Sequence, residues 1–399
     1  MRGKLAAMTD LPAGVYVVPA QDRVVFGRPA DAAVVAEVDR HRAQRIFVVS
    51  TRSLARLAAG PLQRIVAALG ARCAGSFTEV RAHSPREDVI AIAGAARAAR
   101  ADLLVAVGGG SVIDATKAAL MCLWLALDTP EAMEPYRSGA PGDIARRIEA
   151  PADPIRMIAV STTLSASDFT AAAGVTDART SAKQSFVHRL LVPREVVLDP
   201  AATLDTPPWL LFATGIRAVD HAVESYCSPT ANPATEALSL QGLRLLHRAL
   251  PRIKADPADL HARLDAQFGM WQSIAAAAAG AGAGASHGIG YVLGASYGVP
   301  HGHTSCVMLP AVLAWNAAVN GERQRALSEA MAAPDRPASA LIAELVAALD
   351  QPGSLRAVGI AHGELDVIAE RALSYPQLRI NPRPVTTAAQ VREILELAW

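Results

Sequence analysis

Residues 102–117 read DLLVAVGGGSVIDATK, and this stretch limits the possible folds more than any other. An apolar β-type run over residues 103–107 enters three consecutive glycines, and a helix is predicted to follow Ser111. Such a junction exposes backbone N–H groups and the positive end of a helix dipole, while the glycines let a phosphate come close. The stretch therefore predicts a nucleotide pyrophosphate site. Because GxGxxG and P-loop spacing are both missing, tight packing of the turn is the alternative.

Strands and helices alternate through the first half of the sequence. The predicted strands are residues 46–50, 73–80, 103–107, 156–162 and 196–199, and the predicted helices are 31–41, 54–69 and 86–98. This alternation predicts a doubly wound parallel sheet with right-handed crossovers. Two short β-type runs at 15–19 and 23–27 predict a hairpin at the sheet edge. An uncovered edge strand invites pairing, so we expect a homodimer.

The pattern becomes almost entirely helical about halfway along the chain. We therefore expect a dinucleotide-binding domain over 1–200 and an all-α domain over 201–399. Thr206, followed by two prolines, is predicted to cap the first helix of the second domain. The Ala- and Gly-rich residues 275–286 are predicted to form one buried helix with close neighbours, and residues 128–154 a surface excursion.

Composition narrows the classes of partner. Lys and Arg number 38 against 37 Asp and Glu, so the net charge of +1 gives no overall attraction to nucleic acid or an anionic membrane. The four cysteines are far apart in sequence and are predicted to be reduced thiols in or near the core. The longest apolar run, residues 118–127, is too short to span a bilayer. We expect a cytoplasmic protein with a small-molecule substrate.

Three histidines in the helical half lie in segments that favour a shared site. His221 follows Arg217 by four residues and His287 precedes Tyr291 by four, so each pair lies on one helical face. His301 lies in GVPHGHTS. Three imidazoles from different helices could bind Zn²⁺ or Fe²⁺. Spacing alone leaves open that they are hydrogen-bonded core or cleft histidines, because no HExxH-type pair is present.

Several motifs together resemble one family. RVVFG begins at Arg23, GGGSVIDATK at Gly108, STTLSASDFT at Ser161, LDP at Leu198 and NPRPVT at Asn381. With the histidine segments, they resemble the iron-containing (group III) alcohol dehydrogenase family, most of all its maleylacetate reductase branch, over nearly the whole chain. The resemblance implies an α/β fold of dehydroquinate synthase-like architecture. A Rossmann-like amino-terminal domain and an all-α carboxy-terminal domain would hold nicotinamide and substrate in the cleft between them.

The resemblance also implies which residues bind NAD(H) or NADP(H). They are Gly108, Gly109, Gly110, Ser111, Asp114, Thr162, Thr163, Ser167 and Lys183. Asp114 has a second interpretation, as a first-turn carboxylate that complements the helix dipole. Where NAD-selective relatives carry an acid after the second strand, this chain has Ser50, Thr51 and Arg52. The missing acid permits NADPH, and Arg52 could attract its 2′-phosphate, so both cofactors stay open.

The family's metal site is altered at one position. Metal-dependent members use one Asp and three His, and His221, His287 and His301 match the histidines. The Asp position holds Arg217, whose guanidinium cannot ligate a cation and repels one. Asp220 is a poor substitute, because consecutive helical residues point about 100° apart. We therefore expect no bound Fe or Zn, as the maleylacetate reductase branch implies, with the three histidines as ligands if a metal binds.

The same departures suggest new roles. Arg217 could polarise a substrate carbonyl or pair with a substrate carboxylate, as a fixed charge in place of the Lewis acid. Tyr291 stands where the family has a further histidine of its proton relay. A phenol with a pKa lowered by nearby Arg or His can donate a proton, so Tyr291 is a candidate general acid or simply shapes the pocket. Asp168 stands where the family commonly has Glu, and Ser161 stands where the family usually has Pro.

Our main hypothesis is an NAD(P)-dependent oxidoreductase that moves a hydride between nicotinamide and a small carbonyl or alcohol without metal. Arg217 is the predicted electrophile, and Tyr291 or one of the three histidines handles the proton. A carboxylate-bearing oxo acid such as maleylacetate is the first expected substrate, and a different substrate from a biosynthetic pathway is the alternative. Two other hypotheses are a metal-dependent (Fe or Zn) alcohol dehydrogenase and a noncatalytic nucleotide-binding relative.

Overall fold

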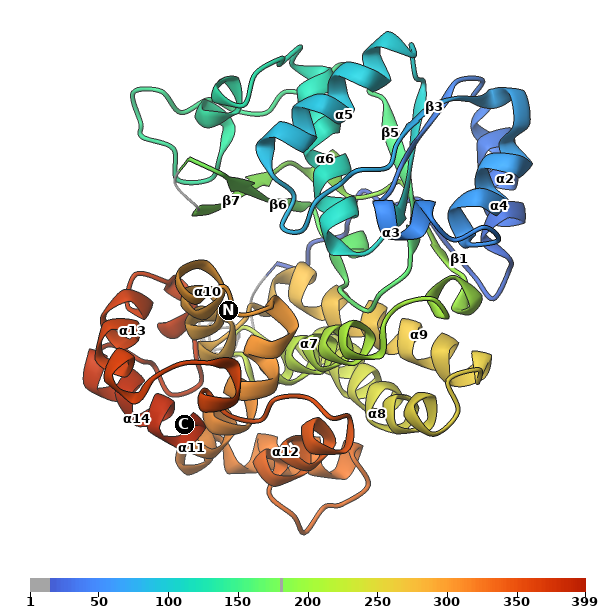
Figure 1. Ribbon diagram of the computed structural model, residues 1–399. Helices are drawn as coiled ribbons and strands as arrows, with labels where there is room; N and C mark the ends of the chain where they lie inside the picture. Colours follow the sequence, from blue (N-terminus) through green and yellow to red (C-terminus); the bar gives the residue numbers. More distant parts are fainter. Residues whose placement is uncertain (1–14, 180–181) are drawn as a thin grey trace, which may run out of the picture.

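A computed structural model describes residues 15–179 and 182–399. A six-stranded parallel sheet forms one half of the molecule and helices form the other (Figure 1). The strands lie in the order β1-β8-β5-β4-β2-β3. Their bounds are β1 (Arg23–Phe26), β2 (Ile46–Val49), β3 (Cys73–Phe77), β4 (Leu103–Gly108), β5 (Arg156–Ser161) and β8 (Glu195–Leu198).

Helices cover both faces of this sheet. Alternate strand residues face opposite sides, so Val105 packs into one apolar cluster and its neighbour Ala106 into another. The first cluster lies under α2 (Ala30–His41) and α4 (Pro61–Leu69). The second lies under α5 (Arg86–Ala98) and α6 (Gly110–Trp124). The doubly wound parallel fold predicted from the alternating pattern is thus confirmed.

The order of strands reverses between β2 and β4. From β2 the chain moves outward to β3, then returns to β4 on the other side of β2 and continues to β5 and β8. Ligands of open α/β sheets bind in the crevice outside the carboxyl ends of the strands at such a reversal. The three glycines at residues 108–110 end β4 at this point.

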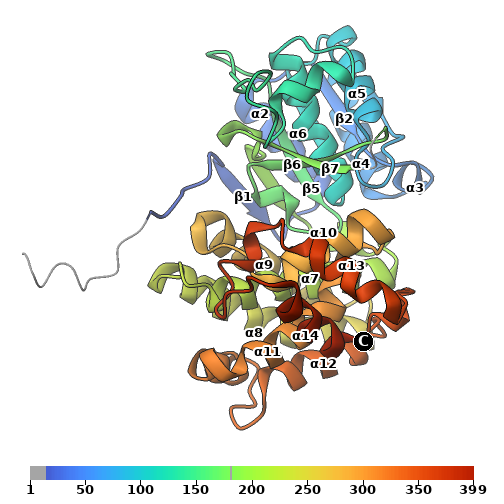
Figure 2. The same ribbon diagram turned by 90° about the vertical axis from the view of Figure 1, so that its left-hand side faces the viewer.

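The second half of the described chain contains helices and no strand. The α-helices are α7 (Pro208–Cys227), α8 (Pro233–Ala255), α9 (Leu260–Ala276), α10 (Ala285–Tyr297), α11 (His301–Ala330), α12 (Ala338–Ala348), α13 (Leu365–Ala372) and α14 (Ala388–Ala398). Helix α7 is central, in contact with α8, α9 and α11 (Figures 1 and 2). It also meets the sheet half, because the Leu164 N–H donates to the Thr214 hydroxyl over 3.1 Å.

The amino-terminal hairpin is absent, and that prediction is wrong. Residues 15–19 form no strand, and β1 pairs in parallel with β8 instead. The Val17 N–H donates to the Ala279 carbonyl at 3.2 Å, so the chain around Val17 contacts the helical half of the molecule instead of pairing with β1. Strand β1 nevertheless remains an edge strand of the sheet among the described residues.

Two other elements differ from the predictions. The helix predicted over 54–69 is split into α3 (Arg52–Ala55) and α4, with Gly60 as the α4 cap. A Cβ at Gly60 would lie 2.7 Å from the Leu57 Cβ, so the chain can fold back there only on glycine. An antiparallel pair, β6 (Ala172–Asp177) and β7 (Ala182–Val187), was not predicted, because its residues are largely polar or small.

The Ala- and Gly-rich segment is not one helix, contrary to the prediction. Helix α9 ends at Ala276, a π-helical turn follows, and Gly280 and Gly282 take φ values of 115° and 71° before α10 begins. These left-handed conformations need glycine. Thr206 does not cap α7 either: Pro207 occupies the cap position, and the Thr206 hydroxyl donates to the Thr162 carbonyl at 2.6 Å.

Residues 128–154 form the predicted excursion, whose only helical part is a short 3₁₀ segment, Glu131–Tyr136. The fully buried Arg86 holds it, through the Pro130 carbonyl at 2.9 Å and the Glu134 carboxylate at 2.6 Å. All four cysteines are free thiols, and three are buried. In the part of the chain that the structure describes, no helix combines the length and apolarity needed to cross a membrane.

Candidate active site

The Gly-rich turn lies where β4 passes into α6. Gly109 is the residue before the helix, and the first amides of a helix have no partner within it. A Cβ at Gly109 would lie 2.8 Å from Thr163 Cγ2, and one at Gly110 would lie 3.2 Å from Ser165 Oγ. The turn therefore packs tightly on residues 162–165, as the alternative interpretation predicted, and it also presents a helix N-terminus, the kind of end at which anions bind.

The loop after β5 holds the two unusual residues of its motif in contact. The Ser161 hydroxyl donates to an Asp168 carboxylate oxygen over 3.0 Å and lies 3.0 Å from the Thr163 carbonyl. Asp168 is fully buried, and burial raises the pKa of its carboxyl to about 6. Ser161 thus supplies a hydrogen bond to the buried carboxylate, which a proline could not do. Thr162 and Thr163 are buried beside the Gly-rich turn.

Asp114 and Ser167 bond to each other rather than standing free. The Ser167 hydroxyl and the Gly174 N–H donate to the two Asp114 oxygens. The buried Lys117 ammonium lies 3.5 Å from the same carboxylate and donates to the Ser167 carbonyl at 2.6 Å. This network ties α6 to β6, which gives Asp114 a structural role whether or not it also meets a cofactor.

Lys183 extends from β7 toward the helical half. Surrounding protein lowers the pKa of its ammonium group, and the positive charge of Arg217 acts in the same direction while Asp114 opposes it. Lys183 in turn lowers the pKa of His301. The amine therefore lies within electrostatic range of both the α6 side of the cleft and the histidine cluster.

The three residues after β2, Ser50 to Arg52, all make contacts within the protein. Ser50 is fully buried and its hydroxyl donates to the Val107 carbonyl at 2.8 Å, so it serves the sheet. Thr51 caps α3. Arg52 is exposed and its guanidinium lies 3.0 Å from the Glu79 carboxylate. Sequence reasoning missed this acid, which comes from the end of the neighbouring strand.

The structure brings the five predicted catalytic residues together. Arg217 and His221 extend from α7, His287 and Tyr291 from α10, and His301 begins α11. Ring centroids lie 5.1 Å apart for His221 and His287, and 6.0 Å apart for Tyr291 and His301, which are stacked. The His287 and Tyr291 rings are 6.3 Å apart. Three helices thus converge on one site, as the sequence predicted.

Electrostatics fix the charge of these groups. Burial, with the nearby Arg217 charge, lowers the pKa of all three histidines, to about 3 for His287. The imidazoles are therefore neutral near pH 7. Burial raises the pKa of Tyr291, and Arg217 only opposes this. The lowered phenol pKa that would favour Tyr291 as general acid is therefore not found, and Tyr291 carries its proton throughout the physiological range.

Two carboxylates on α7 belong to the site: Asp220, considered from the sequence only as a poor metal ligand, and Glu224, which was missed. Asp220 lies 3.7 Å from Arg217 Nη1 and 3.5 Å from His287 Nδ1. Glu224 accepts from the Gly284 and Ser286 amides, both at 2.7 Å, and pairs with His287 Nδ1 at 2.6 Å. Burial raises the pKa of Glu224 to about 7, although the hydrogen bonds from these backbone amides act to lower it. The sequence does carry a signal for these acids, because residues 217, 220, 221 and 224 follow the three- and four-residue spacing of one side of a helix.

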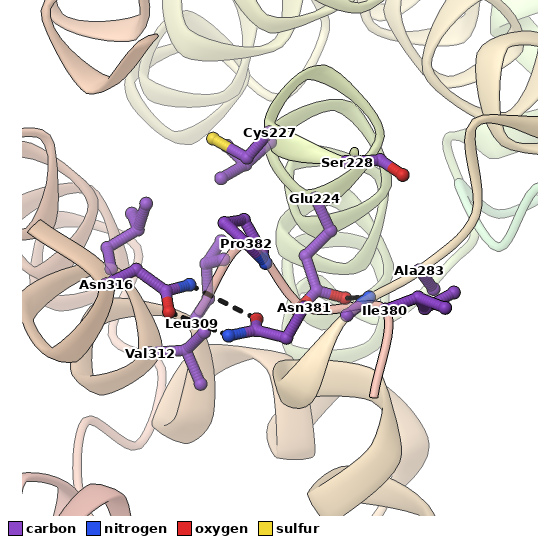
Figure 3. Close-up of a pocket in the computed structure, with 13 residues that line it drawn as sticks. Glu224, Cys227, Ser228, Ala283, Leu309, Val312, Asn316, Ile380, Asn381 and Pro382 are labelled. Carbon is purple, nitrogen blue, oxygen red and sulfur yellow. Dashed lines mark hydrogen bonds between the residues drawn. The ribbon is translucent and has the colours of Figure 1, made fainter. Parts of the chain in front are cut away.

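The closing motif supports the start of α10. The side-chain oxygen Oδ1 of Asn381 accepts from the Ala285 N–H at 3.3 Å. The side-chain amides of Asn381 and Asn316 also exchange hydrogen bonds (Figure 3). Glu224 points toward the same helix start in this view. The first amides of α10 are therefore satisfied by two side chains from distant segments, which fixes the direction of His287.

The three histidines with Arg217 do not fit a metal site, because a guanidinium occupies the position that the resemblance gives to the fourth ligand. Asp220, Glu224 and His287 do bring possible ligand atoms within 4.8 Å of one another, but both carboxylates are already hydrogen-bonded to serines, backbone amides or His287. Among the described residues, the ligating nitrogens of His221, His287 and His301 do not all come within 4.8 Å of one another. These side chains form a cleft around a fixed positive charge.

Comparison with known proteins agrees with this arrangement. The iron-containing alcohol dehydrogenase model matches residues 21–200, and the model for the carboxy-terminal part of the Fe-containing alcohol dehydrogenase family matches residues 211–399. A maleylacetate reductase of Sphingobium indicum is 32% identical over 92% of this chain and 93% of its own length. Dehydrogenase FUM7 of Gibberella moniliformis is 32% identical, over 90% and 92%.

A solved structure shows the same fold. The maleylacetate reductase of Agrobacterium tumefaciens superposes with a TM-score of 0.81 at 27% identity, covering 98% of this chain and 99% of the other. The chain therefore belongs to the iron-containing alcohol dehydrogenase family, in its maleylacetate reductase branch, and is an NAD(P)-dependent oxidoreductase that acts on CH–OH or C=O groups.

Proposed function

We propose that this enzyme reduces a small carbonyl compound bearing a carboxylate, with Arg217 as electrophile in place of a metal. The observation that carries the proposal is the buried Arg217 guanidinium at the ligand position, surrounded by imidazoles that stay neutral. A substrate anion or a developing alkoxide would meet a fixed positive charge that needs no reorganisation. Lys183 adds a second positive charge on the cofactor side.

The cofactor would lie between the two halves. Its pyrophosphate would be held by the amides at the start of α6, with Thr162, Thr163 and Lys183 around the rest, and its nicotinamide would supply the hydride. Arg217 would orient the carbonyl oxygen and stabilise the negative charge that forms there as the carbonyl carbon accepts the hydride. The Tyr291 hydroxyl or a neutral imidazole N–H would then give its proton to that oxygen, completing the alcohol.

The first test is a titration of the protein with NADH and with NADPH, followed by energy transfer from tryptophan to bound nicotinamide. Saturable binding supports the cofactor cleft and ranks the two cofactors. If neither binds, the proposed reductase gives way to the noncatalytic hypothesis.

The second test measures substrate and metal together. Purified protein is assayed with maleylacetate and NAD(P)H before and after treatment with a chelator, and its metal content is measured. We expect turnover that the chelator leaves unchanged. Stoichiometric Fe or Zn, with activity lost on chelation and restored by metal, would overturn the metal-free mechanism in favour of a metal-dependent alcohol dehydrogenase. Failure with maleylacetate but success with another oxo acid would replace only the substrate.

We also propose that the enzyme is a homodimer joined at the β1 edge. The edge strand is uncovered among the described residues, and the adjoining Val15, Val17 and Val18 are exposed. Sedimentation of the full chain as a monomer at micromolar concentration would remove this proposal.

A further inference from the structure

We infer that Asp220 and Ser305 are positioning residues that hold one end of Arg217, leaving its Nε–Nη2 edge to bind two oxygens of one substrate. The inference rests on the proposed function and narrows its substrate class. The substrate would be an oxo acid whose carboxylate is close enough to the reacting carbonyl for both groups to share one guanidinium. Neither residue belongs to the histidine constellation or to the altered metal position.

Two successive hydrogen bonds hold the Nη1 end of the Arg217 guanidinium. Arg217 Nη1 donates to Ser305 Oγ at 2.9 Å, and Ser305 Oγ donates its own hydrogen to Asp220 Oδ2 at 2.6 Å. A hydroxyl has only one hydrogen, so the bond to the carboxylate leaves its lone pairs for the guanidinium. All three side chains are buried. The carboxylate compensates the buried positive charge, while the serine sets its direction.

The other edge of the guanidinium points elsewhere. Arg217 Nε is enclosed and has no hydrogen-bond partner among the described residues. Nη2 likewise makes no hydrogen bond to any residue that the structure describes, but it is not fully enclosed. Nε–H and Nη2–H are parallel donors, the arrangement with which arginine binds an oxygen pair in two hydrogen bonds. An enclosed donor without a partner in the cleft indicates a ligand that supplies the acceptor.

A single carbonyl oxygen would use only one of these donors. A 2-oxo or 3-oxo carboxylate offers its carbonyl oxygen and one carboxylate oxygen on the same side, and so satisfies both. Arg217 would then orient and polarise the reacting group in one contact. An uncharged aldehyde or ketone lacks the second acceptor and leaves a buried donor unpaired.

The main experiment compares Ser305→Ala with Ser286→Ala. Ser286 also donates to Asp220 Oδ2, at 2.8 Å, but makes no bond to Arg217 in the described structure, so it is a matched control. We measure kcat and KM for an oxo acid and for the matching ketone with a methyl group in place of the carboxylate, with NADH dissociation constants and unfolding temperatures for each variant. We expect Ser305→Ala to lose roughly tenfold to a hundredfold in kcat/KM for the oxo acid, and Ser286→Ala less than about threefold.

Asp220→Asn should behave like Ser305→Ala, because a neutral amide no longer compensates the guanidinium. In both variants the preference for the oxo acid over the ketone should shrink, while the dissociation constant for NADH stays unchanged. A purely structural role would lower the unfolding temperature and both substrates' kcat/KM alike, without changing the preference.

Chemical rescue gives a second, independent readout. Arg217→Ala should lose activity and regain part of it when millimolar guanidinium chloride is added, since Ser305 and Asp220 can hold the free ion. The double variant Arg217→Ala, Ser305→Ala should not be rescued. Equal rescue of both, or equal losses in the two serine variants, would overturn the inference. Absence of NAD(P)H binding or of any carbonyl reduction by the unaltered enzyme would instead remove the proposed function itself.

Discussion

The two sides of the cleft are built by opposite means. The sheet side offers backbone amides, glycines and hydroxyls, and its acids are already bonded within the protein, as Asp114 is to Ser167 and Gly174. The helical side offers buried charged and titratable side chains on three helices, arranged around Arg217. A cofactor that does not vary can be held by backbone geometry, whereas the substrate side can change its chemistry by replacing two side chains.

The largest difference between the two sides of the cleft should appear in Arg217→Met, which should lose activity but keep cofactor binding. The variant keeps much of the side-chain volume but removes the charge, so we expect kcat/KM to fall by about 10² to 10³. NADH binding, measured by titration, should not change, because the cofactor side depends on other groups. A parallel loss of cofactor affinity would show that the two sides are not independent. Some loss of stability is also expected, since Asp220 then remains buried without its partner.

Asp168, the buried acid on the sheet side, should affect the pH dependence of stability rather than the activity. The Asp168 pKa of about 6 lies above its ordinary value of 3.8, so the folded state binds the proton more tightly. This contribution to stability is complete below the ordinary pKa and is lost as pH rises through 6, and it is worth roughly 3 kcal/mol. Asp168→Asn mimics the protonated form and should lack this dependence.

Urea unfolding of both proteins at pH 5 and pH 8 measures the effect. The free energy of unfolding of the unaltered protein should fall relative to that of Asp168→Asn as the pH rises. Parallel pH curves would show that Asp168 is already ionised at pH 5.

Gly109→Ala should damage the sheet side alone. The new methyl group would lie 2.8 Å from Thr163 Cγ2, so the turn or the threonine must move. We expect the dissociation constant for NADH to rise roughly tenfold, about 1.4 kcal/mol. Gly94→Ala is the control, because a Cβ there meets nothing within 4 Å. Unchanged cofactor binding in Gly109→Ala would show that the turn serves packing only.

The smallest effect concerns cofactor choice. Glu79→Gln removes the acid that pairs with the exposed Arg52, and the freed guanidinium should bind a 2′-phosphate better. We expect NADPH affinity to rise about threefold and NADH affinity to stay constant, the scale typical of an exposed ion pair. Arg52→Ala should change NADPH binding in the opposite direction. No change in either would place the 2′-position of the ribose elsewhere.

Local patterns predicted the parts of the molecule that local forces determine. The parallel sheet and the strand, turn and helix at residues 102–117 follow from apolar periodicity and glycine. The meeting of Arg217, Tyr291 and the histidines followed from a resemblance. The prediction of an amino-terminal hairpin was wrong, because two short β-type runs carry no information about their partners. Strand β1 pairs with β8, about 170 residues away in sequence.

The network around Arg217 could not be predicted as contacts. Ser305 lies 85 residues from Asp220, and the two meet only because α11 packs on α7. Arg217, Asp220 and Glu224 are spaced so that they lie on one side of α7, but their partners depend on tertiary structure. The raised pKa of Tyr291 was missed for the same reason, since burial depends on neighbours from other elements.

The Ala- and Gly-rich link between α9 and α10 sets a length as well as a path. It delivers the chain so that the amides of Gly284 and Ser286 meet Glu224, and this contact decides which residues of α10 face the cleft. One inserted residue after Gly284 would turn the following helix by about 100° relative to that anchor. His287 and Tyr291 would then leave the cleft together. The number of residues in this link is therefore as tightly constrained as its glycines at 280, 282 and 284, where a side chain would strain the backbone or meet Glu224.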